Sequence, residues 1–311
     1  MTLPFPGVRW LMPLWLLLPA GLSSAGGQPP IIPHHRWQQH APLGVPADAA
    51  RRNLKAGESF TFKTLALRVL ETRTEQRQGK PVDVVQLEVT AGDHRQTFDV
   101  REGGAFNALS YHVAVVAIYG PGELGAGLVA LEVATLQSLP PQVANSDAAG
   151  GAAMRLRIPH TISHVTLHHT GDAKPLLPTD DPAQRLRNLQ AWGARERNWW
   201  DVPYHFLLDL EGRVYEGRDW HFTGETNTTY DPGGHFLVSV MGNYDVQQPT
   251  PAQLAAIADM MAWAIRENGL SVDAIGGHYH YASTGCPGKY LRPFLEDGSL
   301  KRMVAERLAR R

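Results

Sequence analysis

The sequence contains two pairs of histidines and one cysteine, residue types whose side chains bind transition metals. The two pairs lie far apart in the sequence. His168 and His169 stand side by side near the end of a strand-like run. Far downstream, His278 and His280 precede Cys286 on one loop-like segment. A catalytic zinc site needs three protein ligands and an open fourth position for water, which two imidazoles and a thiolate can supply. Spacing alone is equally compatible with histidines that have structural partners.

Strand geometry limits the choice within the first pair. Successive side chains of a strand point to opposite faces, so only one of His168 and His169 can face a shared site. In the downstream loop, His278 and His280 could share a face, and parity does not decide between them. The residues alone therefore leave the choice of ligand histidines open.

The N-terminus has the pattern of a secretory signal peptide. Arg9 precedes the apolar run Trp10–Leu18, and small residues up to Ala25 follow it. The run is shorter than the about 20 apolar residues that span a bilayer. We therefore predict a signal peptide at 1–25 and a secreted or periplasmic protein, with no stable membrane span after cleavage. An uncleaved N-terminal anchor is the alternative.

Cys286 is the only cysteine of the chain. A single cysteine cannot form an internal disulfide, and a thiol in an oxidising compartment needs a reason to exist. Metal binding is such a reason, because a bound thiolate is deprotonated and protected.

The composition is that of a globular protein with about two domains of roughly 150 residues each. Of the 311 residues, 43% are hydrophobic and 19% are charged. Lys and Arg number 29 against 30 Asp and Glu, so the basic excess typical of nucleic-acid-binding proteins is absent from the sequence and we expect no such partner. The basic segment 301–311 is interpreted as a solvated helix face. The oligomeric state is left open.

Composition shifts divide the chain into segments. After the signal peptide at 1–25, we predict a Pro- and Ala-rich linker at 26–50, a small β-rich domain at 51–140 and a second linker at 141–157. Strand-like runs such as Val82–Val89 and Leu128–Val133, separated by turn residues, indicate a small β-sandwich or barrel in the β-rich domain. The sequence of this domain contains no motif that indicates a catalytic or metal-binding site.

The remaining segment, 158–311, has a mixed α/β pattern. Helical periodicity and cap residues, including Pro251 after Thr250, alternate with short strand-like runs. The predicted elements are a strand at His164–His168, a helix at Ala183–Arg195, a hairpin of Tyr204–Asp209 with Arg213–Glu216, a strand at Phe236–Met241, and a helix from Pro251 to Asn268-Gly269.

The metal-donor segments, with the stretches between them, resemble the type 2 N-acetylmuramoyl-L-alanine amidases. This family includes the animal peptidoglycan recognition proteins and the phage amidase-type lysozymes. The matching stretches are Leu167-His168-His169-Thr170, Trp200-Asp201-Val202-Pro203-Tyr204-His205-Phe206, the run from Gly212 to Trp220, Met241-Gly242-Asn243-Tyr244, and the loop from Gly277 to Gly288. They occur in the family's order over about Pro159 to Phe294, and together they are highly specific. The N-terminal domain lies outside the resemblance.

The resemblance implies a mixed β-sheet flanked by helices, preceded here by a small all-β domain. It implies that 158–311 is a zinc amidase domain whose Zn²⁺ ligands are His168, His278 and Cys286. Family members that only bind peptidoglycan commonly lack the cysteine, so its presence favours an active enzyme.

The resemblance also assigns catalytic residues. Tyr204 falls on the family's active-site tyrosine, and Thr284 falls where phage enzymes have a lysine and many animal members a threonine. A related bacterial branch has a glutamate where this chain has Ser239, so the proton donor for the leaving amine is not assigned. We interpret His169 and His280 as structural residues near the site rather than as catalytic ones.

We predict substrate contacts at Trp220, Glu225 and Asn243. The first two lie in or near the region where recognition proteins sort stem peptides, and Asn243 lies in a matching stretch. Trp220 could instead pack in the core, and Glu225 could face solvent. Asp219 stands where a diaminopimelate-type preference is associated with glycine, so the choice between stem-peptide types stays open.

The sequence thus predicts hydrolysis of the amide bond between the lactyl group of N-acetylmuramic acid and L-alanine, with peptidoglycan or muropeptides as partners. The alternative is a recognition module that binds peptidoglycan without cutting it. A third hypothesis makes the β-rich domain a docking module for a wall polymer or a protein.

Overall fold

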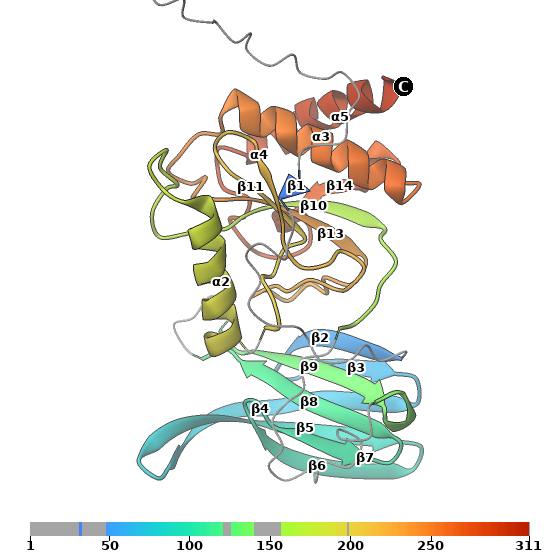
Figure 1. The fold of residues 1–311 in the computed structure, drawn as a ribbon. Coiled ribbons are helices and arrows are strands. Elements are labelled where there is room, and N and C mark those ends of the chain that lie inside the picture. Colours follow the sequence, from blue (N-terminus) through green and yellow to red (C-terminus); the bar gives the residue numbers. More distant parts are fainter. Residues whose placement is uncertain (1–30, 33–47, 121–125, 140–156, 198, 311) are drawn as a thin grey trace, which may run out of the picture.

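The computed structural model describes residues 31–32, 48–120, 126–139, 157–197 and 199–310. The predicted signal peptide at 1–25 and most of both predicted linkers lie outside these ranges. Figure 1 shows two units, an all-β unit below and a mixed α/β unit above. Among the described residues, no helix is long and apolar enough to cross a membrane.

The all-β unit is a sandwich of two four-stranded antiparallel sheets. One sheet has the order β2-β9-β8-β7 and the other β3-β4-β5-β6. The strands are β2 (Ala49–Lys55), β3 (Ser59–Phe62), β4 (Leu65–Arg77), β5 (Lys80–Ala91), β6 (His94–Arg101), β7 (Ala105–Ala108), β8 (Tyr111–Ile118) and β9 (Leu128–Thr135). Alternate residues of both sheets form one shared core, which includes Leu67, Leu87 and Leu131. The predicted all-β region is therefore present, followed by a 3₁₀ turn, η2 (Leu136–Ser138).

The α/β unit contains a six-stranded sheet of order β1-β12-β11-β13-β10-β14. Its strands are β1 (Ile31–Ile32), β10 (His164–His169), β11 (Phe206–Leu208), β12 (Val214–Glu216), β13 (His235–Val240) and β14 (Ile275–Gly277). The β11–β12 hairpin is antiparallel and the other pairs are parallel. The predicted linker differs at β1, because Ile31 and Ile32 pair with Val214 and Tyr215 of this sheet.

The helices of this unit follow their cap signals. They are α2 (Pro182–Glu196), α3 (Pro251–Glu267), α4 (Arg292–Glu296) and α5 (Ser299–Ala309), with the 3₁₀ turns η3 (Val272–Ala274) and η4 (His278–His280). Thr250 caps α3 in a capping box with Gln253, and Asp181 caps α2. The predicted helices, the hairpin and the two strands are confirmed within a few residues, as is the fold class of a mixed sheet with helices.

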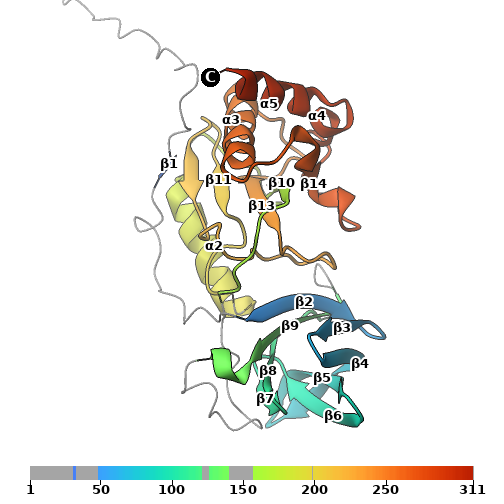
Figure 2. The same ribbon diagram turned by 90° about the vertical axis from the view of Figure 1, so that its right-hand side faces the viewer.

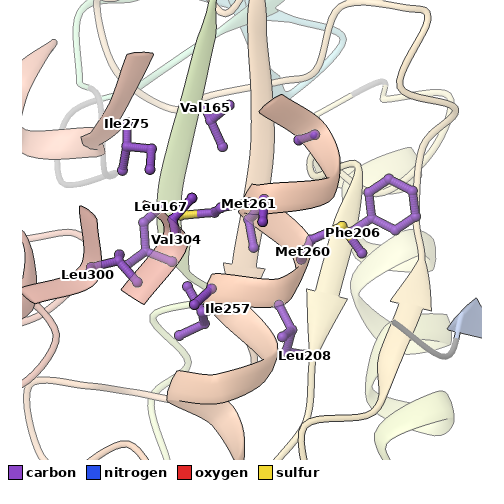
Figure 3. Packing of buried hydrophobic residues seen from close by; sticks show 14 of the residues in the cluster. Val165, Leu167, Phe206, Leu208, Ile257, Met260, Met261, Ile275, Leu300 and Val304 are labelled. Atoms are coloured by element: carbon purple, nitrogen blue, oxygen red, sulfur yellow. The ribbon is translucent and has the colours of Figure 1, made fainter. Parts of the chain in front are cut away.

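The two faces of the sheet have different cover. Leu167, Phe206 and Leu208 point toward α3 and α5, whose Ile257, Met261 and Val304 complete an apolar core (Figure 3). The opposite face contributes Leu207 and Tyr215 to a smaller cluster with Leu186 of α2. Because side chains alternate along a strand, His168 of β10 lies on the face opposite to α3.

Candidate metal centre

The structure brings His168, His278 and Cys286 together. One ligand atom from each lies within 4.8 Å of the others, and Cys286 Sγ is 3.6 Å from His168 Nδ1. The three side chains are 1%, 7% and 9% exposed. His168 lies near the end of β10, and His278 directly follows the neighbouring parallel strand β14. Carboxyl ends of parallel strands meet at one edge of a sheet, which is why residues so distant in sequence converge here.

The chemistry of these donors fits a transition-metal ion. Burial, reinforced by His278, holds the pKa of His168 well below its usual value, and burial lowers the pKa of His278 to about 4. Both imidazoles are therefore neutral near pH 7, which is the form that binds a metal. Burial also raises the pKa of the Cys286 thiol to about 12, so its ionisation needs a nearby cation. A bound metal ion would supply that charge.

Hydrogen bonds hold the outer sides of the ligands. His278 Nε2 lies 2.7 Å from Thr228 Oγ1, and His168 Nε2 lies 3.4 Å from the Tyr230 hydroxyl. Such contacts orient ligand imidazoles and leave the other ring nitrogen, Nδ1, for the metal. The Cys286 sulfur accepts the backbone N–H of His169 at 3.4 Å. Thr228 and Tyr230 were not identified from the sequence, where the only prediction nearby was a substrate contact at Glu225.

The Cys286 loop is fixed by a close backbone approach. Gly288 has φ +98° and packs so tightly that a Cβ there would lie 2.6 Å from the carbonyl carbon of Tyr244. Lys289 N donates to Asp245 Oδ1 at 2.9 Å, and Tyr290 N donates to the Tyr244 carbonyl at 3.0 Å. A side chain at 288 would push the loop, and with it Cys286, away from the histidines.

A cavity of about 260 Å³ opens onto the three donors. Both predicted catalytic residues, Tyr204 and Thr284, also line this cavity. The Tyr204 hydroxyl donates to the His169 carbonyl at 3.2 Å, and its ring centroid lies 5.2 Å from that of His168. Burial raises the pKa of Tyr204, so the hydroxyl stays protonated and able to donate. Thr284 Oγ1 accepts the Cys286 N–H at 3.2 Å.

The cavity wall continues away from the donors. Its lining comprises His168, His169, Thr170, Gly171, Trp199, Pro203, Tyr204, Glu225, Thr226, Asn227, Thr228, Asp245, His278, Thr284, Gly285 and Cys286. A second cavity of about 530 Å³ shares Thr170 and Gly171 and extends along α2, where Lys174, Arg185 and Trp192 line it. Together they offer room for a ligand much larger than the reacting bond.

The predicted substrate-binding residues have different surroundings. Glu225 lines the cavity but is 2% exposed, because it pairs with Arg218 at 2.9 Å and Arg51 at 2.7 Å. The alternative that Glu225 faces solvent is therefore wrong. Trp220 packs edge-on against Trp263, at 6.0 Å between centroids, beside the α3 core. Asn243 Nδ2 donates to the Asp172 carbonyl at 2.9 Å. Substrate contact at all three stays a prediction.

The other histidines and Ser239 occupy supporting positions. His169 is buried, and its Nδ1 accepts the Tyr244 N–H at 3.2 Å. His280 is exposed, and its Nδ1 accepts the Gly277 N–H at 3.0 Å. Ser239 is fully buried and stands opposite His168 in the β10–β13 register, so the position is near the predicted metal ligands but has no carboxylate.

Comparisons with known proteins place this site in a family. Residues 159–289 match the family model described as N-acetylmuramoyl-L-alanine amidase. Peptidoglycan-recognition protein SC2 of Drosophila melanogaster is 30% identical over 142 residues, which are 44% of this chain and 74% of that protein. The chain belongs to the N-acetylmuramoyl-L-alanine amidase family. Peptidoglycan recognition protein 1 of Bos taurus is 31% identical over 150 residues, or 48% of this chain and 77% of that protein.

Other relatives are longer proteins. The N-acetylmuramoyl-L-alanine amidase of Sus scrofa is 33% identical over 144 residues, which are 45% of this chain and 24% of that protein. The chain thus spans about a quarter of the length of this relative. Among solved structures, Drosophila peptidoglycan recognition protein SA is similar with 28% identity and a TM-score of 0.42, covering 48% of this chain and 86% of that one. The family predicted from the sequence is confirmed, and the sandwich lies outside the match.

Proposed function

We propose that this protein is a zinc-dependent N-acetylmuramoyl-L-alanine amidase. It would hydrolyse the amide bond between the lactyl group of N-acetylmuramic acid and the L-alanine of the stem peptide. The observation that carries the proposal is Cys286, buried with two neutral histidines at the base of a cavity. The resemblance associates this cysteine with members that cut rather than only bind.

We assign each residue of the site a separate role in the reaction. His168, His278 and Cys286 would hold the ion, which when bound supplies Lewis-acid polarisation of the amide carbonyl and acidifies water. Tyr204 keeps its proton and donates a hydrogen bond to the His169 carbonyl beside His168. With substrate bound, the hydroxyl would turn to donate instead to the oxygen on which negative charge develops. Thr284, on the cavity wall, fixes the Cys286 loop and can orient the scissile amide.

The two adjoining cavities suit a muropeptide. The smaller one would take the amide itself, and the larger one offers the ammonium of Lys174 and the aromatic surface of Trp192 to a polar ligand. Arg185 in the same cavity is already paired with Asp172 and Asp180. We propose peptidoglycan or muropeptides as the substrate, encountered after secretion.

The decisive experiment compares wild type with Cys286→Ser. Both proteins are incubated with purified sacculi and with one defined muropeptide, and products are identified by mass spectrometry. We expect wild type to release a free peptide that begins with L-alanine. Cys286→Ser should release none above the enzyme-free level, because it loses a thiolate ligand while keeping the side-chain size.

A matched control separates loss of the ligand from disturbance of the loop. Ser283→Ala changes an exposed residue of the same loop that is not part of the cavity lining described above, so its activity should equal wild type. Zinc content and circular dichroism are measured for all three proteins. Wild-type rates in Cys286→Ser would contradict the proposal. Wild-type protein that binds muropeptide without zinc and without release would favour a recognition module.

A further inference from the structure

The segment that orients the two ligand histidines has almost no backbone pairing within its own domain. We call Glu225–Asp231 the orienting segment, because it carries Thr228 and Tyr230. It has no regular secondary structure, and within the described part of the chain no backbone-to-backbone hydrogen bond is formed by residues 226–231. Its path must therefore be set largely by contacts from outside its own backbone.

Within its own domain, the Tyr230 ring packs against His235 and Tyr281. The backbone of the segment is held from strand β2 of the sandwich, which lies against the α/β unit (Figure 2). Asn53 Nδ2 donates to the carbonyls of Thr226 and Thr228, both at 3.1 Å. Asn53 is 6% exposed, and the two threonines are 6% and 8% exposed. One buried amide group thus clamps the backbone on both sides of Asn227.

Arg51, two residues earlier on the same face of β2, holds the start of the orienting segment. Its guanidinium bonds to Glu132 of β9 at 2.8 Å and pairs with Glu225 at 2.7 Å. The other oxygen of Glu225 accepts from Arg218 at 2.9 Å. The carboxylate is therefore shared by one arginine from each domain, in a buried cluster of two arginines and two glutamates. Arg52 adds a partly exposed ion pair to Asp231, at the far end of the segment.

Hydrogen bonds connect the backbone held by Asn53 to His278, one of the proposed metal ligands. Thr226 Oγ1 lies 2.7 Å from Thr228 Oγ1 and also accepts the Thr228 N–H at 3.2 Å. Thr228 Oγ1 in turn lies 2.7 Å from His278 Nε2. A connected path of hydrogen bonds therefore runs from Asn53 in the sandwich to an imidazole of the metal site.

We propose that the sandwich is a positioning domain for the metal centre, in which Asn53, supported by Arg51, holds Thr228 and Tyr230 in the geometry that orients His278 and His168. This inference rests on the proposed function for the metal and for its role in amide hydrolysis. It assigns Asn53 as a positioning residue, since it touches neither substrate nor metal. It also differs from the hypothesis of a separate docking module, because the β2 face that meets the site is buried within the molecule.

The test uses the full chain and five variants, one of them a control. Asn53→Ala removes the clamp, and Asn53→Leu removes the donor while keeping the branched shape and the number of side-chain heavy atoms. Thr228→Val removes the hydroxyl that meets His278, and its combination with Asn53→Ala completes a double-mutant cycle. Lys55→Ala, at an exposed position of the same strand, is the matched control. Zinc affinity is measured by competition with a chelator, and the absorption spectrum of the Co²⁺-loaded protein reports ligand geometry.

We expect Thr228→Val to weaken zinc binding about 10- to 100-fold, the usual effect of losing an outer partner of a ligand. Asn53→Ala and Asn53→Leu should weaken it about tenfold by the same route and change the Co²⁺ spectrum, whereas Lys55→Ala should change neither. The double variant should bind zinc as Thr228→Val does, because both changes break one path. Unchanged affinity and spectrum in both Asn53 variants, or fully additive losses, would overturn the inference.

Hydrogen exchange in the metal-free protein gives a readout that does not depend on zinc. The amides of Glu225 and Thr228 donate to the Pro203 carbonyl and to Thr226 Oγ1. They should exchange faster in both Asn53 variants than in wild type and Lys55→Ala, while β8 amides keep their protection. Equal exchange in all proteins would also overturn the inference. If wild type binds no zinc or Co²⁺, the proposed function fails, and this measurement alone decides whether β2 holds the segment.

Discussion

The two sheets of the sandwich share one core but differ in what covers their outer faces. On the sheet β3-β4-β5-β6, Arg73 pairs with Glu75 at 2.8 Å and with Asp99 at 2.9 Å, and all three side chains are substantially exposed. On the other sheet, every residue of β8 and β9 is buried, on both faces. One outer face is therefore a solvated surface, and the other is an interface with the α/β unit.

Charged residues have different consequences on these two faces. A solvated ion pair gains little, because water and salt screen it and ordering the side chains costs entropy. In the buried cluster of Arg51, Glu132, Arg218 and Glu225, each charge depends on its partners, since removing one leaves another without compensation in a low-dielectric environment. The difference between the faces shows that the sheet containing β8 and β9 forms part of the interface between the two domains.

The largest effect is expected for Glu225→Ala. It leaves Arg51 and Arg218 without their shared carboxylate in a buried site, so the free energy of unfolding should fall by about 3–5 kcal/mol in urea denaturation. Glu225→Gln, which keeps the volume and one acceptor, should lose less. A loss below about 1 kcal/mol for Glu225→Ala would mean that water reaches the cluster and that the two faces are alike.

A somewhat smaller loss is expected for Leu128→Ala. Leu128 is 1% exposed and packs with Val116 and Tyr119 on the outer face of β9, and the guanidinium of Arg197 lies over the Tyr119 ring at 5.0 Å. The cavity left at this junction should cost about 2–5 kcal/mol. Leu70→Ala, at a half-buried position of β4, serves as the comparison and should cost clearly less. Equal losses would argue against a packed interface.

The smallest effect is expected for Arg73→Ala on the solvated face. Its partners Glu75 and Asp99 remain in water when the guanidinium is removed, so the urea midpoint should not change measurably. Raising the salt concentration should likewise leave wild type and the variant indistinguishable. A clear drop in the midpoint would show that this face is also covered in solution.

Elements with local signals could be predicted from the sequence. The helix at Pro251–Glu267 has its Thr250 cap, its Pro251 start and an apolar stripe, and all of these act within a few residues. Strand β2 could not be predicted, because its sequence, Ala-Ala-Arg-Arg-Asn-Leu-Lys, lacks apolar alternation. Its Arg51 and Asn53 are buried by another domain, so their pattern resembles that of an exposed segment.

The site divides in the same way. Residue types and spacing indicated a His-Cys metal site, and strand parity showed that His168 and His169 face opposite ways. The family pattern then selected His168 and His278, which the structure brings within reach of Cys286. Thr228 and Tyr230 carry no motif that marks them as partners of ligands, since a hydroxyl residue in a loop is common for many reasons.

By itself, the sequence determined the family, the donor set and the local elements that present it, because caps, periodicity and motif residues act over short stretches of chain. Only the tertiary structure decided which ring nitrogens accept contacts from Thr228 and Tyr230, that Glu225 pairs with an arginine of each domain, and that Asn53 of the sandwich contacts the segment beside the proposed metal centre. These features depend on contacts between segments distant in the sequence, at separations of 50 for Thr228 and His278, 62 for Tyr230 and His168, and 173 for Asn53 and Thr226. No local pattern encodes them.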